Sequence, residues 1–448
     1  MKGNGQSLMS EGVIWKKITF FAMPLFLGNL FQQMYNTADS LIVGKYLGSE
    51  ALAAVSSSGN LIFLMIGFFN GISVGAGVVI ARFFGAKDYE SMRKAIHTTV
   101  AFGLVSGVIL TIIGVLFAPQ ILIWMGTPKN VLPDSVTFFR IYFAGALGLV
   151  MYNAFVGILQ AIGDSKRPLY YLIISSIINV VLDLIFIRVF HMGVGSAACA
   201  TIIAQFVSAL LCSYRLMRTK DVYALSIPMI KFHKGYLKMI LSYGLPSGVQ
   251  NSIIALANVV VQSNINAFGD LAMAGCGAYA KIEGFAFLPI TSFTMALTTF
   301  VGQNLGAQQY DRVKKGAKFG FLASMICAEM IGFVIYIFAP QLMSAFSNDT
   351  QVVLYGVERA RTSSFFFFLL AYSHCISAVL RGAGKSNIPM IVMMICWCFI
   401  RVSILAVFVP IFSSIQVVYA VYPITWGLSS FIFFLYFNKI NWMEETIS

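Results

Sequence analysis

Long apolar stretches, separated by short polar segments, follow one another along the whole chain. Each stretch has about the 20 mostly apolar residues that an α-helix needs to cross the hydrocarbon core of a bilayer. The runs are continuous rather than alternating, which disfavours the short strands of a membrane β-barrel. The pattern predicts twelve membrane-spanning helices, at approximately 18–43, 52–82, 94–124, 134–161, 168–190, 194–217, 237–267, 271–303, 315–343, 354–381, 388–411 and 413–437.

The composition indicates the same fold class. Hydrophobic residues make up 58% of the 448 residues and charged residues only 10%, which is more apolar surface than a soluble core can bury. We therefore expect an all-α integral membrane protein, whose helices satisfy the backbone hydrogen bonds in lipid. The segment Met1 to Glu11 lacks the pattern of a cleaved signal peptide, so the first helix is expected to remain. All seven Cys fall in apolar spans and are interpreted as small buried residues.

The net charge of +13 is interpreted as a sign of membrane topology and not of binding to nucleic acid. With both termini cytoplasmic, 22 of the 30 Lys and Arg residues fall on the cytoplasmic side, which agrees with the positive-inside rule. The sequence thus predicts a multi-pass protein of the inner (plasma) membrane, with the lipid bilayer and a small-molecule substrate as its partners.

An internal repeat appears when residues are compared at a spacing of 221. Three pairs of segments match at this spacing without a gap, and Pro24 and Pro246 match one residue out of step. The matched pairs are GAKDYESMRKA from Gly85 with GAQQYDRVKKG from Gly306, FAPQ from Phe117 with FAPQ from Phe338, and LQAIGDSKRP from Leu159 with LRGAGKSNIP from Leu380.

The repeat predicts the domain organisation. Each repeat holds six predicted helices, an even number, so both halves keep the same orientation and are related by an axis along the membrane normal. The predicted domains are an N-terminal six-helix lobe at 1–217, a cytoplasmic linker at 218–236 and a C-terminal six-helix lobe at 237–448. We expect a substrate cavity between the lobes and, with two lobes in one chain, a functional monomer.

These features resemble the multidrug and toxic compound extrusion (MATE) family. The tandem six-helix halves, the repeated GAxxY and GDSKRP/GKSNIP segments and the stretch YNTADSLIVGKYLG from Tyr35 carry the resemblance. It implies a V-shaped, pseudo-symmetric bundle of twelve helices that exports small cationic or lipophilic molecules, such as drugs and toxins, by antiport with H⁺ or Na⁺. Helix seven has Gln250 and Asn251 where the NorM branch carries a carboxylate, so the chain is more similar to the DinF/MepA-like branch, with cation coupling centred in the N-terminal lobe.

A few charged residues lie inside the predicted spans, where charge is costly and is interpreted first as functional. Asn179 and Asp183 lie four residues apart and share a helix face, as do Ala197 and Thr201. With Asp39 on the first helix, they form a candidate cation-coupling set of hard oxygen ligands that suits Na⁺. A proton suits the set equally, because burial and a nearby like charge both favour a neutral carboxyl. The charged residues deep in spans are Asp39, Asp183, Lys281, Glu283, Glu329 and Arg401.

The resemblance implies that Asp39, Asn179, Asp183 and Thr201 couple transport to the cation, and that they are its metal ligands if the cation is Na⁺. The alternative is that each polar group only satisfies a neighbour across a helix interface, which suits a single Asn or Thr better than a carboxylate. Pro24 matches a helix-one proline of the family. Because proline removes a backbone hydrogen bond, Pro24 is a candidate hinge or a static kink.

Candidate substrate contacts lie on the same face of the first helix as Asp39. Gln32, Tyr35 and Asn36 precede Asp39 by seven, four and three residues, and Asn153 lies in the fourth helix. Most Phe and Met residues are interpreted as lipid-facing or packing residues. The charged residues of the C-terminal half, Lys281, Glu283, Glu329 and Arg401, are expected to pair with other helices.

Three functional hypotheses follow from the sequence. The first is an exporter driven by H⁺ or Na⁺, and the second is a lipid-linked precursor flippase of the same superfamily, for which the few intramembrane cations are a poor match. The third is an intramembrane enzyme or a channel. No enzyme and no cofactor are expected, because GISVG at Gly71 lies in an apolar helix instead of a nucleophile elbow, and GKS at Gly384 lacks a Walker glycine at Val379.

Overall fold

The computed structural model describes residues 8–124, 127, 129, 131–439 and 442–443. Within these ranges the regular elements are helices, and no strand is present. Three of them are short non-α segments: the π-helices η1 (Leu184–Val189) and η3 (Met394–Ile400) and the 3₁₀ turn η2 (Ile227–Met229). The α-helices are α1 (Ile14–Leu47), α2 (Ser49–Gly85), α3 (Tyr89–Trp124), α4 (Leu132–Ala144), α5 (Ala146–Ala161), α6 (Lys166–Asp183), α7 (Gly195–Arg218), α8 (Lys234–Asn266), α9 (Asp270–Gly306), α10 (Tyr310–Ser344), α11 (Thr350–Ser364), α12 (Phe367–Gly382), α13 (Asn387–Met393), α14 (Arg401–Phe412) and α15 (Ile415–Lys439).

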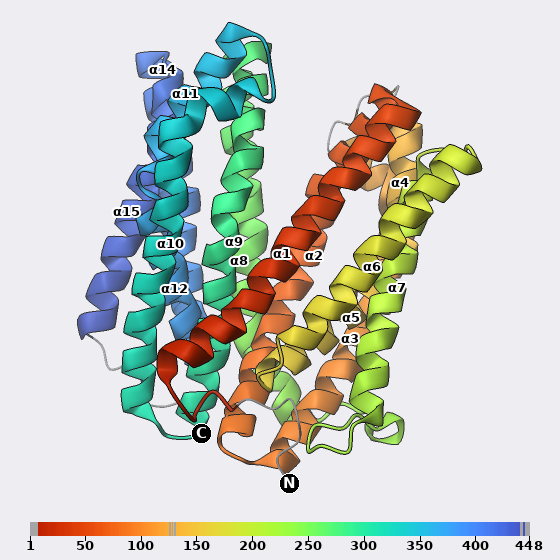
Figure 1. Ribbon diagram of the computed structural model, residues 1–448, viewed down its shortest axis with the longest axis vertical. Helices are drawn as coiled ribbons and strands as arrows, with labels where there is room; N and C mark the ends of the chain where they lie inside the picture. Colours follow the sequence, from red (N-terminus) through yellow and green to blue (C-terminus); the bar gives the residue numbers. More distant parts are fainter. Residues whose placement is uncertain (1–7, 125–126, 128, 130, 440–441, 444–448) are drawn as a thin grey trace. The chain divides into compact units, whose positions relative to one another are not determined.

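The helices coincide with the predicted spans to within a few residues at most ends (Figure 1). In the described part of the chain, nine helices are long and apolar enough to cross a membrane, and the bent pairs α4–α5 and α11–α12 supply two more spans. The first predicted span coincides with α1, which has 34 residues and a polar stretch between Gln32 and Ser40. The predicted all-α membrane fold with twelve helices is therefore confirmed.

One span in each half is broken, which the sequence did not predict. The axis bends by 48° between α4 and α5 and by 54° between α11 and α12. Such a break leaves the first N–H groups of the second helix without partners inside the helix. Glu329 on α10 accepts a hydrogen bond from the N–H of Phe368 in the first turn of α12, at 3.0 Å. This carboxylate inside a span therefore has a structural role at the break.

The backbone repeats with the same spacing as the sequence. Most of the described residues with a left-handed φ come in pairs that are 221 or 222 residues apart. The glycines at 48 and 163 pair with those at 269 and 384, while Lys87 pairs with Gln308 and His191 with Ser413. A non-glycine residue rarely adopts this conformation. Its recurrence at Lys87 and Gln308 shows that the two halves repeat their turns as well as their helices.

The chain folds into two compact units. Of the described residues, the N-terminal unit comprises Leu8 and Leu27–Gly248, and the C-terminal unit comprises Met9–Phe26 and the chain from Val249 onward. The chain thus passes from one unit to the other inside α1 and inside α8, two residues after Pro24 and Pro246 respectively. The predicted lobe and linker boundaries stay a prediction; residues 218–236 lie within the N-terminal unit.

In the N-terminal unit, the start of α8 packs closely against α2. A Cβ atom placed on Gly71 would lie 2.2 Å from the backbone nitrogen of Gly248, and one on Gly75 would lie 2.3 Å from that of Gly244. Only glycine lets two helix backbones approach this closely. The GISVG stretch is therefore a helix-packing motif, as interpreted from the sequence.

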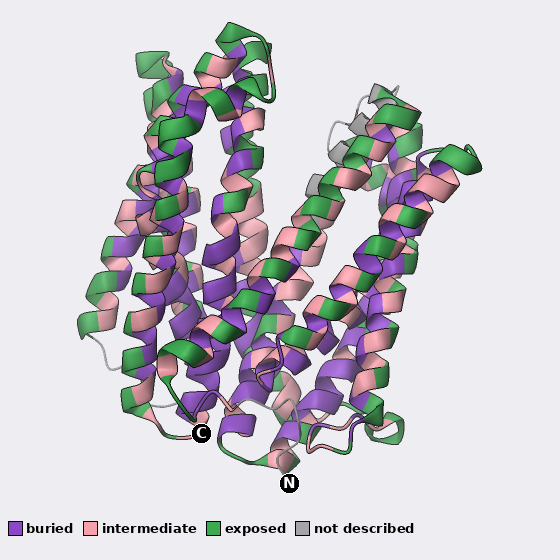
Figure 2. Ribbon diagram, viewed as in Figure 1, coloured by how far each residue is buried: buried purple, intermediate pink, exposed green. Residues whose placement is uncertain are grey.

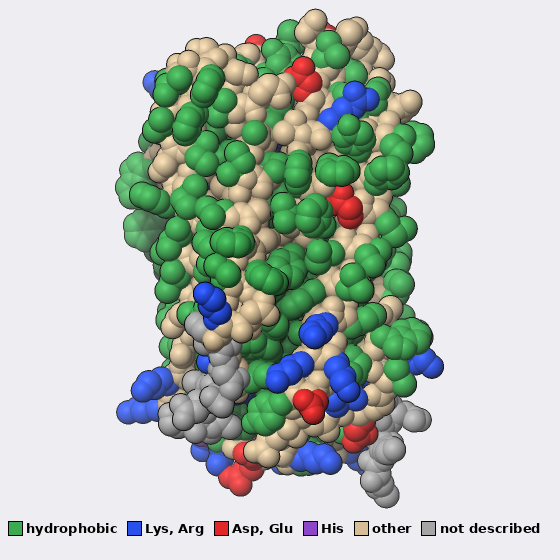
Figure 3. Space-filling view, turned by 90° about the vertical axis from the view of Figure 1, so that its left-hand side faces the viewer, with side chains coloured by type: hydrophobic (Ala, Val, Ile, Leu, Met, Phe, Trp, Pro, Cys, Tyr) green, Lys and Arg blue, Asp and Glu red, His purple; other side chains and the backbone are tan. Residues whose placement is uncertain are grey.

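The outward faces of the helices are strongly apolar. On α10, Phe333 and Met330 are more than half exposed, whereas Ala328 and Gly332 on the opposite side are buried. Figure 2 shows the same alternation of exposed and buried faces along the helices of each unit. On the face drawn in Figure 3, hydrophobic side chains cover most of the surface and Lys and Arg gather toward one end. This distribution matches a protein surrounded by lipid.

The residues just before α1 are held by the C-terminal unit. The N–H of Met9 donates to Oε1 of Gln303 at 2.8 Å, and the carbonyl of Met9 accepts from Arg312 at 3.0 Å. Arg312 also donates to the carbonyl of Gly12 at 2.8 Å and to Oδ1 of Asn304 at 3.1 Å. Five residues thus tie the beginning of the described chain to the junction between α9 and α10.

The segment between α7 and α8 is fixed to the N-terminal unit. The N–H of Ser226 donates to Nε2 of His97 at 3.1 Å, and the N–H of His233 donates to Oγ1 of Thr98 at 3.3 Å. The hydroxyl of Tyr236 donates to Ser91 at 3.0 Å. The predicted linker is therefore a docked segment, which hydrogen bonds to side chains of α3 hold in place.

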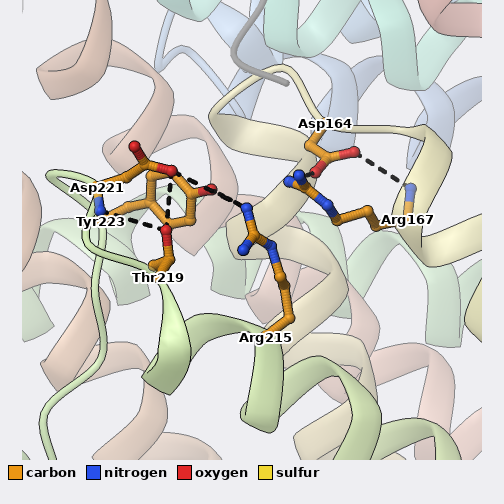
Figure 4. A network of polar contacts seen from close by, with 6 residues as sticks. All are labelled: Asp164, Arg167, Arg215, Thr219, Asp221 and Tyr223. Atoms are coloured by element: carbon orange, nitrogen blue, oxygen red, sulfur yellow. Dashed lines mark hydrogen bonds and ion pairs between the residues drawn. The ribbon is translucent and has the colours of Figure 1, made fainter. Parts of the chain in front are cut away.

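A polar network lies at the start of this docked segment, directly after α7 (Figure 4). Arg215 at the end of α7 points toward Tyr223 and Asp221, at 3.4 and 4.0 Å, and Thr219 donates to Asp221 at 2.8 Å. In the same view, the Asp164 carboxylate binds Arg167 at the start of α6 at 2.5 Å. The charges of these turns are paired locally.

Candidate cation-coupling site

The candidate site is built by three helices of the N-terminal unit. Asp39 lies on α1, Asn179 and Asp183 lie on successive turns of α6, and Thr201 lies on α7. Helices α6 and α7 run side by side (Figure 1). Asn179 and Asp183 are almost fully buried, at 1% and 0% exposure. The helical spacing noted in the sequence places all these polar groups on faces that meet.

One hydrogen-bond chain crosses from α6 to α7. Nδ2 of Asn179 donates to Oγ1 of Thr201 at 3.4 Å, and Oγ1 of Thr201 donates to the carbonyl of Ala197 at 3.0 Å. A hydroxyl has one hydrogen to donate, so Thr201 can only accept from Asn179. Ala197 thus contributes its backbone carbonyl, which orients Thr201, and Thr201 in turn orients the Asn179 amide.

The carboxyl groups of Asp39 and Asp183 are close enough to interact directly. Both oxygens of Asp183, Oδ1 of Asp39 and Oδ1 of Asn179 are buried and have no hydrogen-bond partner in the described part of the chain. Buried polar atoms are nearly always paired, because leaving them unpaired is costly. Four unpaired oxygens from three residues can be satisfied by a bound cation or by protons.

The backbone changes its winding beside this site. The π-helix η1 begins at Leu184, directly after Asp183. Single π-helical turns inside α-helices are rare and often occur at functional sites. This turn could not be predicted from the sequence, because its hydrophobic pattern is that of an ordinary span.

The predicted substrate contacts are only partly brought together. Tyr35 forms a side-chain hydrogen bond with Gln32 and interacts electrostatically with Asp39. Asn153 donates to the carbonyl of Leu149 within its own helix at 2.9 Å. Asn36 is exposed on α1 and its carbonyl accepts from Ser40 in the next turn, at 3.0 Å.

Two tyrosines near Tyr35 were not predicted from the sequence as site residues. Tyr142 at the end of α4 and Tyr152 on α5 lie within electrostatic range of Tyr35. Their hydroxyl groups add polar atoms near the first helix. One signal could have pointed to these two residues. Each is a hydroxyl-bearing side chain inside a predicted span, where lipid-facing residues are purely apolar.

The four charged residues predicted inside the spans of the C-terminal half differ in their surroundings. Lys281 is exposed on α9, and Glu329 binds the start of α12 as described above. Glu283 on α9 lies 4.0 Å from Arg359 on α11, which agrees with the predicted pairing to another helix. Arg401 donates to Oγ1 of Thr425 at 2.8 Å.

A family model describes both halves of the chain. The MatE model matches residues 24–185 and again residues 246–407. The two matched segments cover well over half of the sequence. The chain belongs to the MatE family. The two MatE segments begin at Pro24 and Pro246, the same prolines that precede the passages between the compact units.

Individual relatives match this chain over nearly its whole length, in sequence and in structure. The chain is 28% identical over 448 residues to the probable multidrug resistance protein YoeA of Bacillus subtilis, covering 98% of this chain and 96% of YoeA. A solved MOP superfamily transporter from Pyrococcus furiosus, described as having a binding pocket of reverse polarity, is 26% identical with a TM-score of 0.93 and full coverage of both chains. An outward-facing multidrug resistance MATE transporter is 25% identical with a TM-score of 0.92, again over both full chains. The predicted resemblance is confirmed, and the chain is a multi-pass membrane transporter.

Proposed function

We propose that this MatE protein is a secondary transporter that exports small cationic or lipophilic molecules, including drugs, by antiport with H⁺ or Na⁺. The relative YoeA, matched over nearly the full length of both chains, is named a probable multidrug resistance protein. A solved structure that matches over both full chains is of a multidrug resistance MATE family transporter. The observation that carries the coupling is the group of unpaired buried oxygens on Asp39, Asn179 and Asp183. A flippase for lipid-linked precursors is not favoured, because these relatives are named as drug transporters.

The mechanism is an exchange on the N-terminal unit. When the pair of Asp39 and Asp183 is negatively charged, its field holds a cationic substrate near Tyr35 and Gln32 on the same face of α1. Protonation of the pair, or one Na⁺ held among the oxygens of Asp39, Asn179, Asp183 and Thr201, reduces its negative charge, which weakens that attraction and releases the substrate. A cation drives transport only if it favours one conformation over the other.

The surroundings of the transporter follow from its charge pattern. We place it in the inner (plasma) membrane with both termini cytoplasmic, because Lys and Arg concentrate in the segments between spans that would then face the cytoplasm. Each chain carries a complete coupling site in its N-terminal unit, so a single chain is expected to work.

The decisive test is transport by purified protein in liposomes. Efflux of a fluorescent lipophilic cation is followed while a pH gradient or a Na⁺ gradient is imposed separately. We expect gradient-driven efflux in the wild type and in Asp134→Asn, an exposed carboxylate of the same unit, and none in Asp39→Asn or Asp183→Asn. Efflux by Asp183→Asn at the wild-type rate would contradict the assignment of this residue. No efflux by the wild type under either gradient would contradict the substrate class.

A further inference from the structure

A second group of buried charges lies in the C-terminal unit and is not used by the coupling site. It consists of Glu283 on α9, Arg359 on α11 and Arg401 at the junction of η3 and α14. The ring of Tyr422 on α15 joins the two arginines. Its centroid lies 5.3 Å from Cζ of Arg359 and 4.6 Å from Cζ of Arg401. Three helical segments thus bring two guanidinium groups to one aromatic ring, and α9 adds the carboxylate of Glu283.

The group carries an uncompensated positive charge. Arg359 and Arg401 are only 5% and 2% exposed. Among the described residues, Glu283 is the only carboxylate that lies within 4.0 Å of either guanidinium group. Two positive charges against one negative charge leave a net charge of +1. A buried charge without a counter-charge is strongly unfavourable.

The hydrogen-bonding capacity of the two guanidinium groups is also partly unused. The nearest approach of Arg359 to Glu283 is 4.0 Å, which is too long for a hydrogen bond. Nε of Arg359 and Nε of Arg401 are buried without partners among the described residues. Arg401 makes one side-chain hydrogen bond, to Thr425. Each guanidinium has five N–H donors in a planar fork, and the Nε–H of each is left for a ligand.

We propose that these residues form a binding site for a singly charged anion, either a free halide or the carboxylate group of a small organic molecule. One negative charge neutralises the site, whereas a doubly charged anion would leave the site negative beside Glu283. A guanidinium fork fits the two oxygens of a carboxylate. The side chains of Glu283 and Arg359 are 13% and 7% exposed, so both are largely shielded from solvent.

Two further aromatic rings lie beside the arginines. Tyr279 lies 5.3 Å from Cζ of Arg359, and Trp397 lies 5.4 Å from Cζ of Arg401. These rings stabilise the guanidinium groups by cation–π contacts and hold them in place beside one another. The site goes beyond the proposed function, because it lies in the other unit and takes a ligand of opposite charge.

The test is calorimetric titration of the purified full-length protein, without any gradient or transport. Benzoate and chloride are added as N-methylglucamine salts, so that Na⁺ cannot bind at the coupling site. Neutral benzamide has the shape of benzoate without its charge and serves as the ligand control. We expect binding of benzoate and none of benzamide. Binding of chloride alone would identify a free halide as the anion and would exclude the organic carboxylate.

Variants separate an anion site from a purely structural cluster. Arg359→Gln and Arg401→Gln are expected to weaken binding by about tenfold or more, because each removes a charged donor. Glu283→Gln raises the net charge to +2 and is expected to tighten binding, an opposite change that misfolding cannot produce. Arg361→Gln, an exposed arginine of the same helix, should bind as the wild type does. No anion binding to the wild type, or equal affinity in all four variants, would overturn the proposal.

Discussion

Thr201 determines which atom of the Asn179 amide is left unpaired at the candidate coupling site. Its hydroxyl hydrogen is used by the carbonyl of Ala197, so the amide nitrogen of Asn179 must face Thr201 and the amide oxygen is left unpaired. Helical spacing predicted that Asn179 shares a face with Asp183 and Ala197 with Thr201, whereas the meeting of these faces with Asp39 depends on how the three helices pack. The role of these residues in coupling stays a prediction. The partner of Glu283 could not be predicted, because nothing in one sequence indicates which arginine on another helix lies beside it.

Thr201→Val is expected to slow gradient-driven efflux by up to about tenfold, because it removes a hydrogen bond that orients Asn179, which contributes about 0.5–1.5 kcal/mol. Thr201→Ser keeps the hydroxyl and should transport at close to the wild-type rate. Initial efflux rates in liposomes, at equal protein content, measure both. Equal rates for the Val and Ser variants would show that the hydroxyl does not orient the site.

The docked segment before α8 is expected to depend on pH. Burial, with the nearby charges of Lys231, Lys94 and His97, lowers the pKa of His233 below its ordinary value. The docked state therefore favours the neutral ring. Docking should be complete above the ordinary value of about 6.5 and should weaken as the pH falls below it, toward the lowered pKa.

Hydrogen exchange of residues 226–233, corrected for intrinsic rates, measures this docking. We expect stronger protection at pH 7.5 than at pH 5.5, and a smaller difference in His233→Asn, which cannot titrate. The same pH difference in the variant and the wild type would assign the effect to another group.

At the scale of helices, long apolar stretches predicted the spans well because lipid selects for length and hydrophobicity, which are local properties. The bends between α4 and α5 and between α11 and α12 were not predicted. They depend on partners from elsewhere in the chain, such as Glu329 at the start of α12. The π-helices η1 and η3 were missed for a different reason: these segments are apolar on almost every face, so the phase shift caused by an extra residue in one turn is not visible in the pattern.

The glycine contact between α2 and α8 gives a prediction at this scale. Gly71→Ala places a methyl group 2.2 Å from the backbone of Gly248, so it should destabilise the protein by about 1–3 kcal/mol. Gly77→Ala on the same helix meets only an ordinary contact of 3.6 Å and should be neutral or stabilising, because alanine is the better helix former. The thermal unfolding midpoint in one detergent compares the two. A lower midpoint for Gly77→Ala than for Gly71→Ala would contradict the packing argument.

For the whole molecule, the sequence repeat predicted two halves, and the positive-φ pairs confirm that repeat in the backbone. The repeat could not show that the chain passes between compact units inside α1 and α8. That division depends on contacts made by the first residues of each helix, which have no signature in the pattern of apolar and polar positions.

The position of Pro24 and Pro246 before these passages leads to a test of the hinge prediction. Alanine supplies the N–H that proline lacks and allows a complete hydrogen-bond ladder, so Pro24→Ala and Pro246→Ala should stiffen α1 and α8. We expect several-fold slower turnover in liposomes with unchanged binding of the fluorescent cation. Pro119→Ala, inside α3 and away from the passages, is the matched control. If all three variants turn over at the same rate, these prolines are static kinks.

The hydrogen bond between Met9 and Gln303 joins residues 294 positions apart, and this separation constrains how the protein is made. Ribosomes add about 5–20 residues per second, so the segment before α1 waits roughly 15–60 seconds for its partners. During that time, the first helix must be held in the membrane without its final neighbours. A gene divided in the segment between α7 and α8 would also separate Met9–Phe26 from the unit that these residues complete, so two separately expressed halves could assemble only by exchanging their first helices.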